Sequence, residues 1–306
     1  MCVIAQIRLD NNIYLAKNRD RYYITPIKLI RDKINNVEVV YLLDVKTGWI
    51  EGINEYGISL VNSVLPITKE ENMTDDGKYS GKSDGKFDGK YQGKITNKDG
   101  QIILNALSQT RIEDALSILI NCKCYNTLGL NGHTIISNGK YSIGIEHLSD
   151  KVEPVIKIID KNYIRTNHTV HINYKNGGYT PNTNFKGYKS SILRQRKLKK
   201  LLKTIKTKED IVKNLTDINY KDPCNSIYRI GYRCDTNYKF GFATTTQLFI
   251  DVNSLTLNIY LDKFNSKFVG VKDNIGDSNN SKVKYNVQYI NREFYPESTL
   301  KVLPPS

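Results

Sequence analysis

Short runs of alternating residues, bounded by turn-forming residues, dominate this sequence and limit it to folds built on antiparallel strands. The first run is Cys2–Leu9, in which every second side chain from Val3 to Leu9 is apolar and would share one strand face. A polar turn at residues 10–12 leads into a second strand at 13–16, so the chain begins with a hairpin. Further runs predict strands at 37–44, 49–54, 58–64, 132–137, 141–146, 155–159, 163–166, 241–251 and 255–262. Asn138-Gly139 predicts a type I′ turn inside one of these hairpins.

Two groups of helical patterns interrupt the strands. Residues 101–108 and 110–121 form the first group. The second begins with a basic helix over 186–208, followed by a helix that opens at Thr207-x-x-Asp210. The order of strands, helices, strands, helices and strands predicts an α+β fold in which helices cover the outside of antiparallel sheets.

The net charge of +14 is concentrated in one segment. Residues 186–208 hold ten Lys and Arg residues and no acid, which leaves a net charge of +4 for the remainder of the chain. Leu198, Leu201, Leu202 and Ile205 follow the spacing of one helical face, so we expect an amphipathic helix with a solvated basic side. Contact of this side with nucleic acid or an anionic membrane is the alternative.

Two segments are expected to lie outside the packed part of the chain. Gly-Lys pairs recur every four residues between 77 and 94, and a segment this poor in apolar residues predicts a disordered insert at 68–98. The polar residues 265–306 predict a peripheral C-terminal arm. A single domain over 1–264 contains the insert.

The cysteines and histidines indicate neither a disulfide framework nor a metal site. Five cysteines are an odd number, and Cys122-x-Cys124 lacks the spacing and the companion ligands of a zinc site. His168 and His171 follow no ligand spacing, and we expect them to be hydrogen-bonding loop residues. The sequence implies no metal or nucleotide cofactor. It also has neither a run of about 18 apolar residues nor a signal peptide, so we expect a cytoplasmic protein without a membrane span.

Cys2 is the residue with the most distinctive chemistry. Removal of Met1, which is usual before a small second residue, would leave a cysteine that carries both a thiol and a free α-amine. Their ordinary pKa values, about 8.5 and about 7.7–8.0, suit proton transfer between them near neutral pH. Such a residue can act as a nucleophile that supplies its own base, although a cysteine in second place can also occur by chance.

Several short segments, taken in order, resemble a known family. They are Cys2, Lys17-Asn18-Arg19-Asp20, Gly52-Ile53-Asn54-Glu55-Tyr56-Gly57, Gly144-Ile145-Glu146, Arg165-Thr166-Asn167-His168, Ser191-Ile192-Leu193-Arg194 and Thr244-Thr245-Thr246-Gln247-Leu248-Phe249. Between residues 2 and 262 this series resembles the cysteine N-terminal-nucleophile (Ntn) hydrolases. These comprise linear-amide hydrolases such as penicillin V acylase and bile salt (choloylglycine) hydrolase, and the acyl-CoA:6-aminopenicillanate acyltransferases. Asn18-Arg19-Asp20 is also similar to proteins of the transport-and-Golgi-organisation type, but Arg21 replaces their glutamate.

The resemblance implies a four-layer αββα sandwich of two antiparallel sheets, with the N-terminus at a cleft between them. It implies that Cys2 is the nucleophile, that Asp20 holds it and its amine, and that Asn167 and the backbone N–H of Asn62 form the oxyanion hole. Asp20 and Asn167 also fit ordinary turn and loop residues. The resemblance further assigns substrate binding to Lys17, Arg19 and Arg194, although Lys17 stands where the hydrolases usually have arginine.

The sequence therefore favours an enzyme that cleaves a linear, non-peptide amide through an acyl-Cys2 intermediate. The partner would be a small N-acyl amide, joined by acyl-CoA if an amine rather than water resolves the intermediate. The family resemblance also implies a homo-oligomer. The alternative is a catalytically inactive protein that binds nucleic acid or an anionic membrane through the helix over 186–208.

Overall fold

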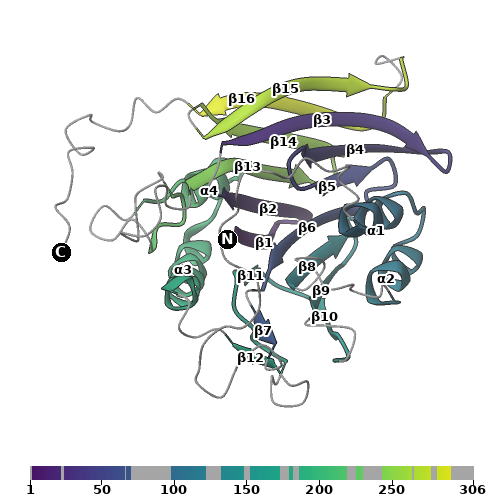
Figure 1. Cartoon of the computed structure of the whole chain (residues 1–306). Coiled ribbons are helices and arrows are strands. Elements are labelled where there is room, and N and C mark those ends of the chain that lie inside the picture. The colour runs from purple at the N-terminus through teal and green to yellow at the C-terminus, as the bar shows by residue number, and fades with distance from the viewer. Residues whose placement is uncertain are drawn as a thin grey trace.

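Two large β-sheets lie face to face in the computed structural model, with helices on the outer face of each (Figure 1). The structure describes residues 2–21, 24–65, 67–69, 98–121, 132–147, 152–172, 179–181, 186–218, 225–229, 243–263, 265–276 and 281–290. The Gly-Lys pairs, Cys122-x-Cys124 and the last 16 residues lie outside these ranges. No helix within the described ranges is long and apolar enough to cross a membrane.

The two sheets differ in size. Sheet A has six strands in the order β11 (Tyr163–Arg165), β1 (Cys2–Leu9), β2 (Asn12–Arg21), β13 (Ala243–Asp251), β14 (Thr256–Asp262) and β16 (Lys284–Ile290). Sheet B has eight, in the order β10 (Val155–Ile159), β9 (Ser142–His147), β8 (Gly132–Ser137), β6 (Ser59–Val64), β5 (Trp49–Asn54), β4 (Val37–Asp44), β3 (Thr25–Ile34) and β15 (Ser266–Asp273). A small third sheet pairs β7 (Ile67–Lys69) with β12 (Tyr179–Pro181), so the predicted insert at 68–98 overlaps strand β7 at its start.

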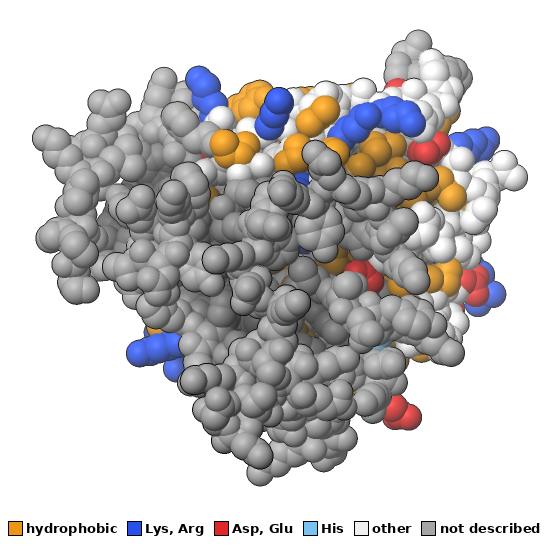
Figure 2. Space-filling view, viewed as in Figure 1, with side chains coloured by type: hydrophobic (Ala, Val, Ile, Leu, Met, Phe, Trp, Pro, Cys, Tyr) orange, Lys and Arg blue, Asp and Glu red, His pale blue; other side chains and the backbone are white. Residues whose placement is uncertain are grey.

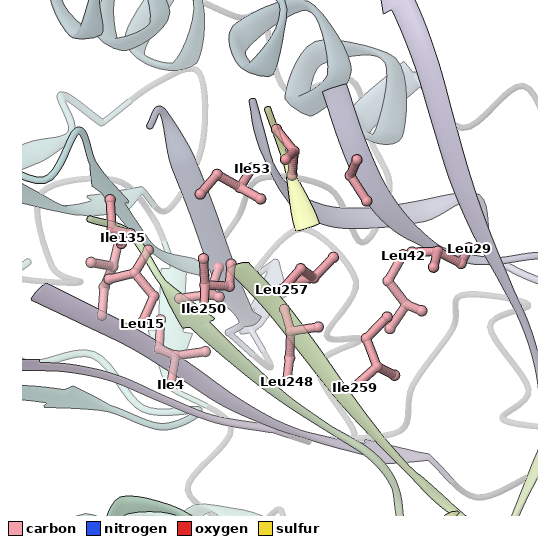
Figure 3. Close-up of a cluster of buried hydrophobic side chains, with 14 of the residues drawn as sticks. Ile4, Leu15, Leu29, Leu42, Ile53, Ile135, Leu248, Ile250, Leu257 and Ile259 are labelled. Atoms are coloured by element: carbon pink, nitrogen blue, oxygen red, sulfur yellow. The ribbon is translucent and has the colours of Figure 1, made fainter. Parts of the chain in front are cut away.

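Three layers of apolar side chains hold the four layers of structure together. The central one lies between the sheets and includes Ile4, Leu15, Leu42, Ile53 and Leu248 (Figure 3). Helices α1 (Lys98–Leu107) and α2 (Ile112–Asn121) pack on the outer face of sheet B. Helices α3 (Lys186–Leu201) and α4 (Lys208–Leu215) pack on the outer face of sheet A. This arrangement confirms the predicted αββα sandwich.

Strand β1 is buried on both faces. Val3, Ala5 and Ile7 pack under α3 and α4, whereas Ile4 faces the layer between the sheets. The N-terminal strand is therefore hydrogen-bonded to β11 on one side and β2 on the other, and covered above and below. Cys2 begins this strand, so the pairing of β1 with β2 fixes its position.

The sheets are not wholly antiparallel, which corrects one expectation. β15 pairs parallel with β3, and β16 pairs parallel with β14, each at the edge of its sheet. After β14 in sheet A, the chain forms β15 in sheet B and then β16 in sheet A. Strand β16 runs in the same direction as β14, so these two neighbours pair in parallel. Residues 265–306, predicted to form an arm, thus contain two edge strands. Hydrophobic and basic side chains gather along the rim at β3 and β15 (Figure 2), where Val269 and Val271 are 52% and 44% exposed.

A buried arginine ties these late strands to the early ones. Arg31 of β3 donates to Glu38 of β4 at 3.0 Å and to Asp273 of β15 at 3.1 Å, and its side chain is 2% exposed. The Ser281 hydroxyl and the Lys282 backbone N–H both donate to Glu38 just before β16. These contacts compensate the buried charge of Arg31 and fix where β15 and β16 begin or end.

Two local predictions need correction and one is confirmed. The type I′ turn lies at Asn35-Asn36, where both residues have positive φ (51° and 64°), and not at Asn138-Gly139, where only Gly139 does. The basic segment is not one helix, because α3 ends at Leu201 and a short 3₁₀ turn follows at 202–204. Helix α4 begins where Thr207-x-x-Asp210 predicts, with Thr207 as its N-cap, and the two side chains cap each other's backbone N–H groups.

Candidate active site

Charged and polar side chains replace the apolar layer at the end of the sandwich where Cys2 lies. Cys2 pairs with Arg19 across β1 and β2, so the two side chains share the face that looks toward sheet B. Lys17 is on the same face two residues earlier, whereas Asp20 points to the other face, toward α3. The alternation of β2 therefore sends two cations between the sheets and one carboxylate toward the helices.

The thiol of Cys2 is buried and surrounded by positive charge. The residue is 4% exposed, its backbone N–H donates to Oδ1 of Asn167 at 2.7 Å, and Nη1 of Arg21 lies 3.8 Å from Sγ. Burial alone would raise the pKa of the thiol, but Lys17, the positively charged N-terminus of the chain and Arg21 together lower it to about 6. Cys2 is thus largely a thiolate at neutral pH, the form that attacks carbonyl groups.

Glu51 of β5 compensates both cations that enter from β2. Its two carboxylate oxygens accept from Lys17 Nζ and from Arg19 Nη2, and all three side chains are at most 2% exposed. Burial, together with the charges of Arg19 and Arg21, lowers the pKa of Lys17 well below its usual value. Two of the three predicted substrate-binding residues are therefore already engaged by a carboxylate of the opposite sheet.

Asn62 of β6 joins this charged group through its side chain. Its Oδ1 accepts from Lys17 Nζ at 3.1 Å and from the indole N–H of Trp49. Its Nδ2 lies 3.4 Å from the carbonyl oxygen of Ile50. The structure brings Asn62 to the same end of the sandwich as Cys2.

Asp20 lies at the centre of a second buried network, on the helix side of sheet A. Oδ2 accepts from Arg194 of α3 at 3.1 Å and lies 3.7 Å from Nε of Arg229, while Oδ1 accepts from the Thr244 hydroxyl at 2.8 Å. A β-bulge between Thr244 and Thr246 turns Thr244 to this side, since Thr246 pairs with Arg19 and Thr244 with Asp20. Two arginines thus compensate this fully buried carboxylate.

Asn167 connects Cys2 to the network of Asp20. Its Oδ1 accepts from Cys2 N and, at 3.3 Å, from Arg194 Nη2, while its Nδ2 donates to the carbonyl oxygen of Val64 at 2.7 Å. Arg194 is fully buried and links Asn167 to Asp20. The structure therefore brings together all seven residues singled out from the sequence, which are Cys2, Lys17, Arg19, Asp20, Asn62, Asn167 and Arg194.

Sequence reasoning gave no role in the site to Arg21, Glu51, Arg229 or Thr244, although each contacts this set. A charged residue inside a strand pattern, as at Glu51, is the signal that could have found one of them, because such a charge must meet a partner in the core. Among the described residues no cluster of three or more His, Cys, Asp or Glu side chains could hold a metal ion. Nε2 of His133 hydrogen-bonds to the carbonyl oxygen of His168, and Nδ1 of His168 hydrogen-bonds to the Ser191 hydroxyl.

Comparison of the whole chain with solved structures places this geometry in a known fold. A cysteine-to-alanine mutant of the conjugated bile acid hydrolase from Clostridium perfringens matches with a TM-score of 0.50 and 13% identity, over 83% of this chain and 87% of that one. An arginine-to-leucine variant of the same enzyme matches with a TM-score of 0.54 and 12% identity, over 85% and 89%. The chain has the Ntn-hydrolase fold.

The likeness to Ntn hydrolases is one of structure rather than sequence. A weaker match, with a TM-score of 0.47 and 12% identity, is the penicillin V acylase from Agrobacterium tumefaciens, over 94% of this chain and 100% of that one. No protein-family model and no curated protein sequence matches the chain. Comparison of structures thus finds the Ntn-hydrolase fold, whereas comparison of the whole sequence finds no relative.

Proposed function

We propose that this protein is a cysteine Ntn amidohydrolase that cleaves a linear, non-peptide C–N amide bond after removal of Met1. One observation carries the proposal. The nitrogen that would become the free α-amine is held by Asn167 at 2.7 Å, next to a buried thiol with a pKa of about 6. A nucleophile, its own base and a fixed amide side chain are thus assembled at the first residue of a fully packed strand.

In the first half-reaction the Cys2 thiolate attacks the amide carbonyl carbon, and a C–S bond forms as the carbonyl π electrons move to oxygen. The α-amine, which holds the thiol proton as an ammonium group, then delivers that proton to the leaving nitrogen. The C–N bond breaks, the amine product departs, and an acyl-Cys2 thioester remains. A pKa of about 6 for the thiol favours the thiolate–ammonium pair before substrate arrives.

In the second half-reaction water attacks the thioester. The α-amine takes a proton from the water, the C–S bond breaks, and the carboxylic acid product leaves with the thiolate restored. If an amine attacked instead of water, the same intermediate would give acyl transfer, and an acyl-CoA could then supply the acyl group. We propose hydrolysis as the primary reaction because it requires no further partner.

The surrounding residues would stabilise the oxyanion, hold Asn167 and the amine in place, and supply positive charge. A primary amide has two N–H donors, and because Val64 takes one from Asn167, the other is the proposed donor to the oxyanion. The backbone N–H of Asn62 is the proposed second donor. Asp20 holds Asn167 and the amine in place through Arg194, and Arg229 shares the compensation of its charge. Lys17 and Arg19, held by Glu51, supply positive charge toward the acyl group.

The basic segment supports this proposal better than the binding alternative. Helix α3 contributes Arg194 and Leu198 to the interior, both fully buried, and its exposed side carries Lys199 and Lys200. The helix is therefore a component of the candidate active site, and Lys199 and Lys200 lie on its solvated outer face.

The test uses purified, processed protein with a panel of N-acyl amides, including conjugated bile acids because the matched hydrolase acts on them. Intact mass establishes the loss of Met1. Turnover by the native chain and its abolition in Cys2→Ala is the expected result. Replacement of Lys199 and Lys200 by Gln serves as the control and leaves turnover unchanged. Full activity with Met1 attached, or in Cys2→Ala, would overturn the proposal.

A further inference from the structure

Ser191 lies where helix α3 meets the loop that carries Asn167. Its hydroxyl oxygen is 2.6 Å from the backbone nitrogen of Asn167, 2.9 Å from Nδ1 of His168 and 2.8 Å from Oγ1 of Thr166. Ser191 and Thr166 are fully buried, and Asn167 is 1% exposed. One hydroxyl group therefore contacts three consecutive residues of this loop, out of reach of solvent.

Counting the protons that each group can donate assigns a direction to each of these hydrogen bonds. The N–H of Asn167 can only donate, so Ser191 Oγ accepts from it. The Thr166 hydroxyl donates to the carbonyl oxygen of Ser191 at 2.9 Å, so it accepts the Ser191 proton. The second lone pair of Ser191 Oγ then accepts from Nδ1–H of His168. Every donor and acceptor of the Ser191 hydroxyl is used, which fixes its orientation.

His168 is neutral in this arrangement. Burial is the main reason that its pKa is lowered to about 4. The neutral ring with its proton on Nδ1 is the tautomer that the Ser191 hydroxyl requires. The carbonyl oxygen of His168 is bound in turn by Nε2 of His133 on β8 at 2.8 Å. The loop is thus fixed from α3 on one side and from sheet B on the other.

Arg194 completes the contact of α3 with Asn167. It follows Ser191 by three residues and therefore lies on the same face of the helix, one turn later. Ser191 holds the backbone of Asn167, whereas Arg194 contacts its side-chain oxygen at 3.3 Å. The spacing Ser-x-x-Arg thus places Ser191 at the backbone nitrogen of Asn167 and Arg194 at its side-chain oxygen.

We infer that Ser191 is a positioning residue for the amide reaction, because its hydroxyl sets the backbone of Asn167 and so aims the Asn167 amide at the reacting carbonyl oxygen. This inference rests on the proposed function in so far as Asn167 is the oxyanion donor. It adds a residue that touches neither Cys2 nor substrate. A misplacement of about 1 Å in such a donor can cost on the order of 10²-fold in rate.

The test compares Ser191→Ala with Ser137→Ala. Ser137 is an equally buried serine in the β8–β9 hairpin, where its hydroxyl bonds to Ser142 and to the carbonyl oxygen of Tyr141. We expect Ser191→Ala to lower kcat by roughly 10- to 100-fold with little change in KM. Alkylation of Cys2 by iodoacetamide forms no oxyanion, so its rate should stay within about twofold of the native chain. Ser137→Ala should turn over substrate like the native chain.

A second variant and a second measurement keep the inference separable from the proposed function. Thr166→Val keeps the side-chain shape and removes the hydroxyl that accepts the Ser191 proton and donates to the Ser191 carbonyl oxygen, but it leaves the contact of Ser191 with Asn167, so a smaller loss of kcat is expected. Hydrogen exchange of the Asn167 backbone amide should accelerate in Ser191→Ala and stay slow in Ser137→Ala, whether or not a substrate is known. Native turnover by Ser191→Ala, or unchanged exchange at Asn167, would overturn the inference. Absence of turnover in the native chain would contradict only the proposed function.

Discussion

The backbone nitrogen of Cys2 donates to Oδ1 of Asn167 at 2.7 Å, across 165 residues of chain. Removal of this side chain, in Asn167→Ala, takes away both the holder of the amine and the proposed oxyanion donor. We expect kcat to fall by about 10²- to 10³-fold, measured by steady-state kinetics on the processed protein. Asn253→Ala is the matched control, because Asn253 Oδ1 likewise accepts a strand N–H, from Ile13 at 2.8 Å. Equal activity of the two variants would contradict the role of Asn167.

Arg21 contributes to the low pKa of the Cys2 thiol, and its replacement should be visible in the pH profile of alkylation. Arg21→Gln removes a positive charge 3.8 Å from Sγ, so the pKa of Cys2 should rise from about 6. Alkylation should then be several-fold slower at pH 6, where fewer molecules are thiolates, and unchanged at pH 9. Arg196→Gln removes an exposed arginine of α3 and should leave the profile as it is. A profile of Arg21→Gln that overlays the native one would show that Arg21 has no influence on the thiol.

Glu51 is expected to be essential for stability as well as for the site. Glu51→Gln leaves Lys17 and Arg19 buried without their carboxylate, and loss of one partner of a buried ion pair typically costs about 3–5 kcal/mol. Urea denaturation at pH 7 should show this decrease in the free energy of unfolding. Combination with Lys17→Met should recover part of it, because one unpaired cation is removed. The exposed carboxylate of Glu209 provides the control, and Glu209→Gln should change stability by less than about 0.5 kcal/mol.

His133 should make the protein less stable in mild acid. Burial is the largest cause that lowers its pKa from 6.5 to about 3. Below pH 6.5 the unfolded chain therefore takes up a proton that the folded protein does not, and stability falls by up to about 1.4 kcal/mol per pH unit toward pH 3. His133→Gln keeps a donor for the His168 carbonyl and should reduce the slope of unfolding free energy against pH by one proton. Identical slopes in the two proteins would rule out this contribution.

Local patterns were enough to predict most of the strands that form the middle of each sheet. Cys2–Leu9 and Val37–Asp44 were found at their observed bounds, because turns and alternation are encoded within a few residues. β3 was missed, since Lys28, Arg31 and Asp32 interrupt its apolar pattern. The charge of Arg31 is compensated by Glu38 and Asp273, and the latter is 242 residues away, so no local window contains the reason.

In the candidate site, too, short sequence segments identified some residues, whereas residues that depend on distant contacts were missed. The resemblance of short segments identified Cys2, Asp20 and Asn167, which the structure joins directly or through Arg194. Glu51 and Arg229 were missed because their importance depends on which cations and carboxylates meet after the sheets stack. Parallel edge strands β15 and β16 were missed for a related reason, since a chain that switches sheets leaves no periodic signal.

The pairing of β2 with β13 has a consequence for how the protein is made. Asp20 and Arg19 of β2 lie opposite Thr244 and Thr246 of β13, which follow them by more than 220 positions in the sequence. Contacts so distant in sequence form late in folding. Asp20 therefore lacks the Thr244 hydroxyl that donates to it until β13 has been synthesised and has paired with β2. A chain that stops before β13 would leave one edge of β2 unpaired and the buried carboxylate of Asp20 without one of its donors.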